Sequence, residues 1–373
     1  MASPSLVAGL DVGGTKTLAV AVDTAALDVA VGAAWPWSRG AGDGDGSGAG
    51  WEAEGGADGS GRPSIIATVR RATGVGGRDP LLASTADVLS ALADAAGIGV
   101  DGFAAVGLGV PGLVDRGAGT VRHAVNLGVD DNPVPLAAHL GELTGAPVVV
   151  DNDVNLAAVG AAVALGCRAD LAYLSVGTGL AAGLLLDGRI RRGAHGAAGE
   201  IGHLPIDPHG PLCECGQRGC LEAVASGTAI AARWPAPDGA LTAASTLLAA
   251  VERGDPDAAA VLEEVAGHLA GAVALLAQTV DPEVVVLGGG VADAGPGLLA
   301  AVQDALRRRA ARSPVLAAIN LADRVALVPD GVPAGALGAA VVAHRHLERH
   351  RAEPHTAHDR PHIVAGGVAS DTL

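Results

Sequence analysis

Apolar residues near the start of the chain fall in two short runs that a glycine turn separates, in the stretch SLVAGLDVGGTKTLAVAVD. Short runs rich in valine and leucine and bounded by glycine are typical of β-strands. The second run extends from Leu18 to Val22, so the pattern predicts a hairpin that turns between Gly13 and Thr15. Gly9 and Gly14 have the spacing of a Walker A loop, but Thr15 stands where that motif needs lysine and a strand follows instead of a helix. A Walker A loop is therefore excluded.

The same order of strand, glycine turn and strand recurs in LAYLSVGTGLAAGLLLDG, where the bend falls at Gly177, Thr178 and Gly179. Two such hairpins far apart in one chain indicate a duplicated lobe. A third glycine cluster, Gly288 to Gly290, follows the strand-like EVVVL, and glycine lets a ligand approach the backbone closely. Each cluster alone is more often a simple turn. Together they predict a nucleotide cleft between two lobes, because ligands of α/β proteins bind beyond the carboxyl ends of strands.

Polar residues interrupt the apolar pattern of APVVVDNDVNLAAVGAAVAL at one place. Val148 to Val150 read as a buried strand and Val154 to Leu165 as a helix, so Asn152 and Asp153 lie where the strand ends and the helix begins. Two interpretations stay open for Asp153: it caps the helix, or it accepts a proton from a hydroxyl nucleophile. The helix dipole is expected to keep its carboxyl ionised at neutral pH.

Composition narrows the class of protein. A chain of 373 residues is long for a single core, so two lobes are expected, and hydrophobic residues make up 49% without an apolar run that spans a membrane. The start of the chain has no secretory pattern, and we expect a soluble, cytoplasmic protein. The net charge of −16 argues against nucleic acid, which requires clustered lysine and arginine. The expected partners are small molecules or other proteins, and hydrogen bonds are expected to carry recognition because the chain has few aromatic residues.

Three of the four cysteines lie within HGPLCECGQRGCLE, as Cys213, Cys215 and Cys220. A reducing compartment and the one-residue gap between the first two disfavour a disulfide, and thiolates on short glycine turns can instead surround a tetrahedral zinc ion. Unligated thiols in a loop are the alternative. A fourth ligand is missing, and spacing alone favours His209 over His203 and Cys167.

Six motifs, GLDVGGTKT, GVPGLVD, DNDVN, VGTG, GAAGEIGH and CECGQRGCLE, together resemble the ROK family of sugar kinases, repressors and related open reading frames. The resemblance covers roughly Leu6 to Ala340 apart from one insertion. It implies an α/β fold of the two-lobed, actin-like (ribonuclease-H-like) sugar kinase type, whose lobes close on ATP and a hexose.

The resemblance also implies roles for single residues. Asp153 matches the catalytic base, while Asn152, Glu200, His203 and Glu222 match sugar-binding residues. The implied ligands of a structural Zn²⁺ are His203, Cys213, Cys215 and Cys220, so His203 replaces the nearest neighbour His209 as the fourth ligand. ATP, with Mg²⁺ near Asp11, is expected to contact three glycine segments, through Asp11, Gly13, Gly14, Thr15, Lys16, Gly177, Thr178, Gly179, Gly288 and Gly289. Lys16 is equally well read as a solvated strand lysine.

The implied activity is ATP-dependent phosphorylation of a hexose, most like that of a zinc-containing glucokinase in the transfer of phosphate to glucose. The alternatives are a kinase for N-acetylglucosamine, N-acetylmannosamine, mannose or fructose, and a non-catalytic sugar sensor. A DNA-binding repressor is disfavoured because only about five residues precede the first strand. Family members commonly form homo-oligomers, so a dimer or tetramer is expected, with neither nucleic acid nor membrane as partner.

The expected domains are a small α/β lobe over residues 1–155 and a large α/β lobe with the zinc motif over 156–334. A helix over 335–346 is expected to return to the small lobe, and 347–373 to form a disordered tail. Residues 39–62 are rich in glycine and predict a disordered insertion, with a lid over the cleft as the alternative.

Overall fold

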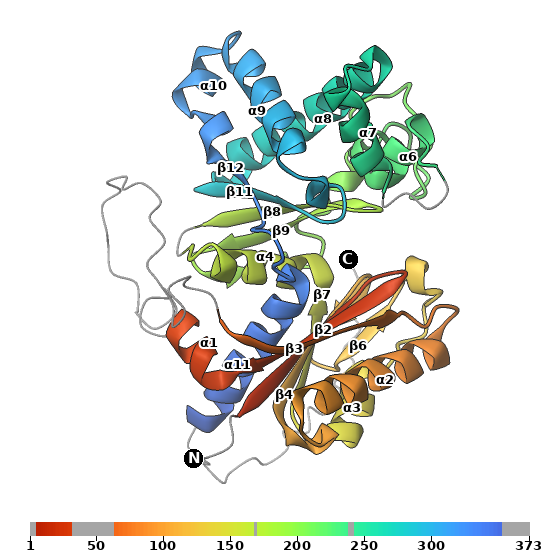
Figure 1. Ribbon diagram of the computed structural model, residues 1–373, viewed down its shortest axis with the longest axis vertical. Coiled ribbons are helices and arrows are strands. Elements are labelled where there is room, and N and C mark those ends of the chain that lie inside the picture. The colour runs from red at the N-terminus through yellow and green to blue at the C-terminus, as the bar shows by residue number, and fades with distance from the viewer. Residues whose placement is uncertain (1–4, 32–62, 168–169, 238–241, 353–373) are drawn as a thin grey trace, which may run out of the picture.

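Two five-stranded sheets organise the protein, whose computed structural model describes residues 5–31, 63–167, 170–237 and 242–352 (Figure 1). The first sheet has the order β3-β2-β1-β4-β7 and the second the order β10-β9-β8-β11-β12. The first comprises β1 (Leu6–Val12), β2 (Lys16–Asp23), β3 (Ile65–Ala72), β4 (Phe103–Val110) and β7 (Val148–Asn152). The second comprises β8 (Leu171–Val176), β9 (Leu180–Leu186), β10 (Arg189–Ile190), β11 (Val284–Gly288) and β12 (Val325–Leu327).

The two sheets share one topology around their central strands. In the first sheet β1 pairs antiparallel with β2 and parallel with β4, which pairs parallel with β7. In the second, β8 pairs antiparallel with β9 and parallel with β11, which pairs parallel with β12. Both predicted hairpins are confirmed, and so is the duplicated lobe that they indicated. A small hairpin of β5 (Leu113–Asp115) and β6 (Thr120–Arg122) follows β4.

Helices lie outside each sheet and between the two. The helices beside the first sheet are α1 (Thr24–Val31), α2 (Arg78–Ala96) and α3 (Leu136–Thr144). Those of the second lobe are α5 (Leu221–Ala225), α6 (Gly227–Arg233), α7 (Ala243–Glu252), α8 (Pro256–Val280), α9 (Pro296–Ala310) and α10 (Pro314–Ala318). Between the sheets run α4 (Asp153–Ala164) and α11 (Ala334–Ala352). Short 3-10 turns are η2 (Val100–Gly102), η3 (Val125–Leu127), η4 (Ile201–His203), η5 (Ala292–Ala294) and η6 (Leu321–Arg324).

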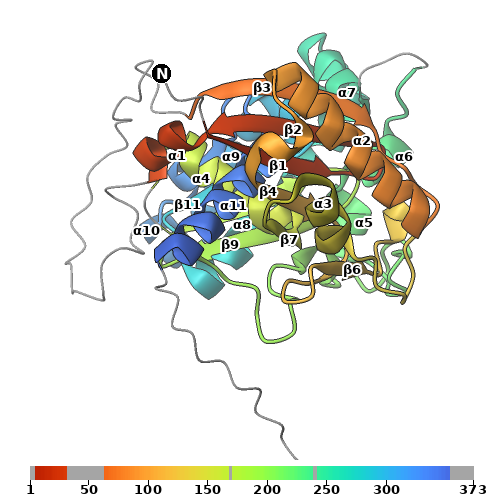
Figure 2. The same ribbon diagram turned by 90° about the horizontal axis from the view of Figure 1, so that it is seen from below.

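Three clusters of buried side chains correspond to this layering. One packs α2 and α3 on the outer face of the first sheet, as Figure 2 shows from below, and one packs α7, α8 and α9 on the outer face of the second. The third joins the inner faces of both sheets to α4 and α11. The fold is therefore the two-lobed α/β arrangement expected from the sequence, with α4 and α11 shared by the lobes.

Glycines allow α4 and α11 to pack closely on each other and on β1. A Cβ atom at Gly9 would lie 2.0 Å from the carbonyl oxygen of Ala336, and one at Gly160 would lie 1.9 Å from that of Ala334. A Cβ at Gly338 would lie 1.8 Å from the carbonyl oxygen of Leu156. Gly9, which gives the sequence its false Walker A spacing, is thus required by helix packing.

Among the described residues, one helix meets the length and composition test for a membrane span, which the apolar pattern did not reveal. This helix is α8, with a mean hydropathy of 1.5 in its most apolar window, half of which is buried inside the protein. Its buried residues, among them Leu262, Leu269, Val273 and Leu276, belong to the core of the second lobe. Buried core helices pass the same test, so the hydropathy of α8 is not evidence that it spans a membrane.

The expected boundaries of the C-terminal segment are wrong in part. Helix α11 continues to Ala352, whereas a disordered tail was expected from residue 347. Leu347 packs against the core between the sheets, and the rings of His346 and His350 contact each other, so the last turns have packing partners. Residues 353–373 and the insertion at 39–62 lie outside the described residues. The division into domains at 155/156 falls inside α4 and stays a prediction.

Candidate active site

Asn152, and not Asp153, caps helix α4. The side-chain oxygen of Asn152 accepts hydrogen bonds from the backbone N–H groups of Val154 and Asn155, each at 3.1 Å. Asp153 is the first residue of the helix, and its Oδ1 accepts from Val154 N at 2.9 Å. The interpretation of Asp153 as the N-cap is therefore wrong. Within the described residues the amide nitrogen of Asn152 makes no hydrogen bond, which leaves it free to donate to a ligand.

Two carboxyls, those of Asp153 and Asp11, lie at the ends of β7 and β1. Burial raises the pKa of Asp153 to about 6, against the N–H groups at the start of α4, and the charge of Glu200 raises it further. Burial also raises the pKa of Asp11 to about 7, with Asp153 adding to the rise and Lys16 opposing it. Desolvation thus outweighs the helix dipole expected to hold Asp153 well ionised, although a pKa near 6 still leaves it mostly ionised at pH 7.

Because burial raises the pKa of Asp11, its ionised carboxylate is expected to destabilise the folded protein when no ligand is bound. Since its pKa in the folded protein lies above the ordinary value of 3.8, stability is full below about pH 4 and is lost as the pH rises through 7. We expect Asp11→Asn to raise the free energy of unfolding at pH 8 by about 1–3 kcal/mol, and the gain to vanish toward pH 4. Denaturant unfolding at the two pH values measures it. Asp94→Asn, on the exposed surface of α2, is the control, and equal pH profiles for parent and Asp11→Asn would contradict the prediction.

The two glycine turns keep part of the donor set expected for phosphate. The N–H of Gly13 donates to Lys16 O at 3.0 Å and that of Gly177 to Gly179 O at 3.0 Å, so these two groups close their own hairpins. Within the described residues, the N–H groups of Gly14, Thr15, Thr178 and Gly179 have no hydrogen-bond partner. In these two turns, the backbone N–H groups left for phosphate are therefore those of these four residues.

Residues of α5 and α6, the helices that follow the cysteine motif, form hydrogen bonds with the second glycine turn. Glu222 Oε2 accepts from Leu180 N at 2.8 Å, directly after the turn. The N–H of Gly227 donates to Gly177 O at 2.7 Å, and the hydroxyl of Thr228 donates to Thr178 O at 2.8 Å. A Cβ atom at position 179 would lie 2.5 Å from Glu222 Oε2, which explains the glycine there.

Two residues that the sequence did not single out lie among these groups. Tyr173, on β8, is buried, and its phenol occupies the space that a Cβ of Gly288 would need. Burial raises its pKa, with the charges of Asp11, Asp293 and Asp153 adding to the rise. Burial likewise raises the pKa of Asp293, after β11, while Lys16 opposes the rise. The signal available for Tyr173 was its position in the second hairpin as the chain's single tyrosine.

These electrostatic interactions indicate which segments lie near one another. The charge of Lys16, in the first hairpin, lowers the pKa of both Asp11 and Asp293, so the first hairpin lies on the same side as the segment after β11. Glu200 acts on Asp153, so the loop after β10 faces the start of α4. Residues from both sheets therefore converge on the carboxyl ends of β1, β7, β8 and β11.

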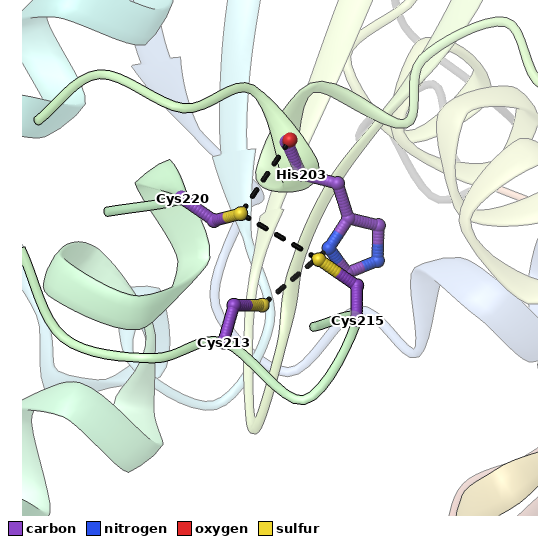
Figure 3. A group of neighbouring side chains, drawn as sticks. All are labelled: His203, Cys213, Cys215 and Cys220. Atoms are coloured by element: carbon purple, nitrogen blue, oxygen red, sulfur yellow. Dashed lines mark hydrogen bonds between the residues drawn. The ribbon is translucent and has the colours of Figure 1, made fainter. Parts of the chain in front are cut away.

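Three cysteines and a histidine converge beside this region (Figure 3). The three sulfurs of Cys213, Cys215 and Cys220 and one nitrogen of His203 all lie within 4.8 Å of one another. Cys213 Sγ is 3.7 Å from His203 Nδ1, and Cys215 Sγ is 3.6 Å from Cys220 Sγ. The arrangement contains His203, as the family resemblance implied, and neither His209 nor Cys167, which lie elsewhere. Spacing alone therefore favoured a histidine that lies outside this cluster.

Gln217 and Glu222 surround the cluster. The side-chain amide of Gln217 donates to His203 O at 3.1 Å and lies 3.6 Å from Cys215 Sγ. Hydrogen bonds from Gln217 lower the pKa of the Cys215 thiol to about 6. Glu222 Oε1 lies 4.0 Å from Cys213 Sγ, while its other oxygen holds the second glycine turn. Glu222 therefore contacts both the cysteine cluster and the turn.

The fold is the two-lobed, actin-like type that ROK sugar kinases share. A model of the ROK family matches residues 82–346, and the chain belongs to the ROK family.

Relatives with assigned activities are similar over part of the chain. A glucokinase of Halalkalibacterium halodurans is 39% identical over 213 residues, which cover 52% of this chain and 63% of that protein. An N-acetylmannosamine kinase of Yersinia pestis is 38% identical over 184 residues, 48% of this chain and 62% of that protein. The chain thus matches somewhat less than two thirds of the length of these relatives.

A solved structure is similar over nearly the whole length. The ROK family glucokinase of Streptomyces griseus, in complex with glucose and AMPPNP, is 28% identical with a TM-score of 0.67. The similarity covers 91% of this chain and all of that one. The two-lobed fold expected from the sequence is therefore confirmed.

Proposed function

We propose that the protein phosphorylates a hexose with ATP and that glucose is its preferred acceptor. The observation that carries the proposal is the carboxyl of Asp153, which begins α4 at the end of β7 and whose pKa burial raises to about 6. The similarity to glucokinases and to a glucokinase structure with glucose and AMPPNP supports the choice of sugar.

Asp153 acts as the general base in this proposal. A carboxylate with a pKa slightly below the working pH is ionised and still basic enough to accept the proton of a sugar hydroxyl as phosphate is transferred. The N–H of Val154 on its Oδ1 fixes the orientation of the carboxyl. Phosphoryl transfer depends chiefly on positioning and on neutralising charge, so one oriented base and a set of donors suffice.

Four side chains provide hydrogen bonds to the sugar in this proposal. Asn152 donates through its amide nitrogen, because its oxygen is engaged in capping α4. Glu200 and His203 follow from the loop after β10, and Glu222 from α5. A site that hydrogen-bonds each hydroxyl rejects analogues that leave one of its polar groups unpaired.

The glycine turns bind the nucleotide in this proposal, with Mg²⁺ beside Asp11. Four N–H donors, those of Gly14, Thr15, Thr178 and Gly179, are available for phosphate oxygens, and Gly288 and Gly289 let the nucleotide approach the second sheet. The carboxyl of Asp11 is the oxygen ligand type that Mg²⁺ prefers, and a cation there offsets its repulsion with Asp153. When bound, Mg²⁺ supplies charge neutralisation to the phosphates.

The cysteine cluster fits a structural Zn²⁺. For four ligands at a Zn–S distance of about 2.3 Å, tetrahedral geometry sets neighbouring sulfurs about 3.8 Å apart. The separations of 3.6 Å between Cys215 and Cys220 and 3.7 Å between Cys213 and His203 Nδ1 are near that value. Zn²⁺ supplies a fixed orientation to the imidazole, so that Nε2–H of His203 is left to donate to a sugar hydroxyl.

We propose a cytoplasmic homo-oligomer, since a thiolate cluster of this kind persists best in a reducing compartment. The net charge of −16 supports small molecules over nucleic acid as ligands. Within the family a homo-oligomer is the common state.

A panel of sugars against ATP and polyphosphate tests the function. With ATP and Mg²⁺, we expect kcat/KM for glucose to exceed that for N-acetylglucosamine, N-acetylmannosamine, mannose and fructose by about tenfold or more, as pairing of every hydroxyl predicts. An N-acetylmannosamine kinase is also similar to this chain. A preference for N-acetylmannosamine would therefore support kinase activity but contradict glucose as the preferred acceptor. If neither ATP nor polyphosphate phosphorylated any of these sugars, the kinase proposal would be rejected in favour of a non-catalytic sugar sensor.

A further inference from the structure

A buried carboxylate two residues before the proposed base links the two lobes. Asp151 is the fourth residue of β7, and its side chain is only 2% exposed. Arg192, two residues after β10 in the second sheet, donates from Nε to both carboxylate oxygens at 3.2 Å, and its Nη2 also donates to Oδ2. Arg116, after β5, places its Nε 3.1 Å from the same Oδ2. Asp151 therefore pairs with one arginine from each lobe.

Asp151 is tied to the residues that the proposed function uses. Its Oδ1 accepts from the backbone N–H of Asn152 at 2.9 Å, in addition to the bond from Arg192. Asn152 in turn caps α4, and Asp153 opens that helix. A shift of the Asp151 carboxylate is therefore transmitted to the amide and the base within two residues.

Arg192 begins the loop that presents the other sugar-binding residues. The loop leads from Arg192 to Glu200 and His203, and its residues 193–197 are exposed, with no buried side chain to hold them. Its ends are fixed by the bond from Ala198 N to Arg192 O at 3.1 Å and by the bond from Ala182 N to Gly199 O at 2.8 Å. Arg192 is thus the side chain that connects this loop to the first lobe.

We propose that Arg192 and Asp151 are a positioning pair that holds the loop of Glu200 and His203 in register with Asn152 and Asp153. The inference rests on the proposed function, because the register matters only if one sugar contacts both groups. A bidentate guanidinium fixes both distance and angle, which a single point charge does not. Neither residue touches the sugar, so both act through the groups that they orient.

Because Arg116 also pairs with Asp151, Arg192 can be substituted without leaving the buried carboxylate unpaired. Removing one partner of a buried ion pair is costly when it leaves an uncompensated charge. Without Arg192, however, Asp151 keeps the guanidinium of Arg116 at 3.1 Å. An Arg192→Gln variant is therefore expected to fold, with the loop released from the first lobe.

Arg191 offers a matched control. It neighbours Arg192, and its guanidinium pairs with Asp187, whose side chain is 76% exposed. For Arg192→Gln we expect the Kd of glucose, measured by calorimetry, to rise about tenfold, and the Kd of ATP to stay within about twofold of the parent. Arg191→Gln is expected to change neither. Arg192→Lys retains the charge without the bidentate geometry, and its Kd for glucose is expected between those of parent and Arg192→Gln.

Hydrogen exchange without ligand separates this inference from the proposed function. We expect the backbone amides of residues 193–203 to exchange faster in Arg192→Gln and Asp151→Asn, and not in Arg191→Gln. The double variant is expected to exchange no faster than either single one, because both remove one interaction. If the parent bound no sugar, the proposed function would fail while the exchange experiment still tested the pair. Unchanged loop exchange in Arg192→Gln, or an equal loss of glucose affinity in Arg191→Gln, would overturn the inference.

Discussion

Asp153→Asn is expected to lower kcat by roughly 10²-fold or more while the Kd of glucose changes little. The amide keeps the size of the carboxyl and accepts from Val154 N as before, so the start of α4 is preserved. It has no basicity with which to take the proton of the sugar hydroxyl, and a general base contributes about 10²–10⁴-fold. Steady-state kinetics with calorimetric binding of glucose measures the two quantities separately.

The unsubstituted protein provides a second readout of the same carboxyl. Because burial raises the pKa of Asp153 to about 6, the ionised base is lost as the pH falls through that value, and kcat/KM is expected to fall with it. Asp153→Asn is expected to lack this decline. Near-normal turnover of the variant, or an unchanged acid limb in its pH profile, would remove Asp153 from the role of base.

Cys215→Ser is expected to abolish zinc binding and to weaken glucose binding by about 10–100-fold, the range for loss of an orienting partner at a metal site. With one thiolate missing, the ring of His203 is no longer fixed, and Glu222 lies 4.0 Å from the adjacent Cys213. Glu222 also holds Leu180 N after the second glycine turn, so ATP affinity is expected to fall as well, by a smaller factor.

Metal analysis, calorimetry and thermal melting together test the cysteine prediction. The parent is expected to contain about one zinc per chain, as a Cys₃His site requires. Cys167→Ser is the control, because this buried cysteine lies outside the cluster and its loss is expected to leave the zinc content unchanged. If a variant without metal bound glucose normally, the zinc would only stabilise the loop and would not orient His203. If the parent contained no zinc and were fully active, the zinc site itself would be contradicted.

Local pattern was sufficient for the elements that carry the proposed chemistry. The alternation of apolar runs and glycine turns located both hairpins, because an antiparallel pair with a tight turn is encoded within one short segment. The strand at Val148 and the helix after it were placed to within one or two residues of β7 and α4. The motifs then placed the thiols and His203 together, which spacing alone did not.

The local sequence pattern could not predict contacts between segments that are distant in the chain. The cap at Asn152 rather than Asp153 depends on backbone angles at the junction, and both residue types favour that position. The pKa of Asp153 reflects burial in the assembled fold and the charge of Glu200, 47 positions away, which no local pattern reports. The pairing of Asp151 with Arg192 joins residues 41 positions apart on two sheets. Such pairings need the assembled fold.

The most direct test of the central claim is identification of the product formed from glucose and ATP. Purified protein with Mg²⁺, glucose and ATP is followed by ³¹P NMR, with Asp153→Asn as the control protein. The account predicts one ADP for each glucose 6-phosphate formed by the parent, and a rate lower by roughly 10²-fold or more for the variant. ADP formation without a sugar phosphate, or equal rates for the two proteins, would contradict it.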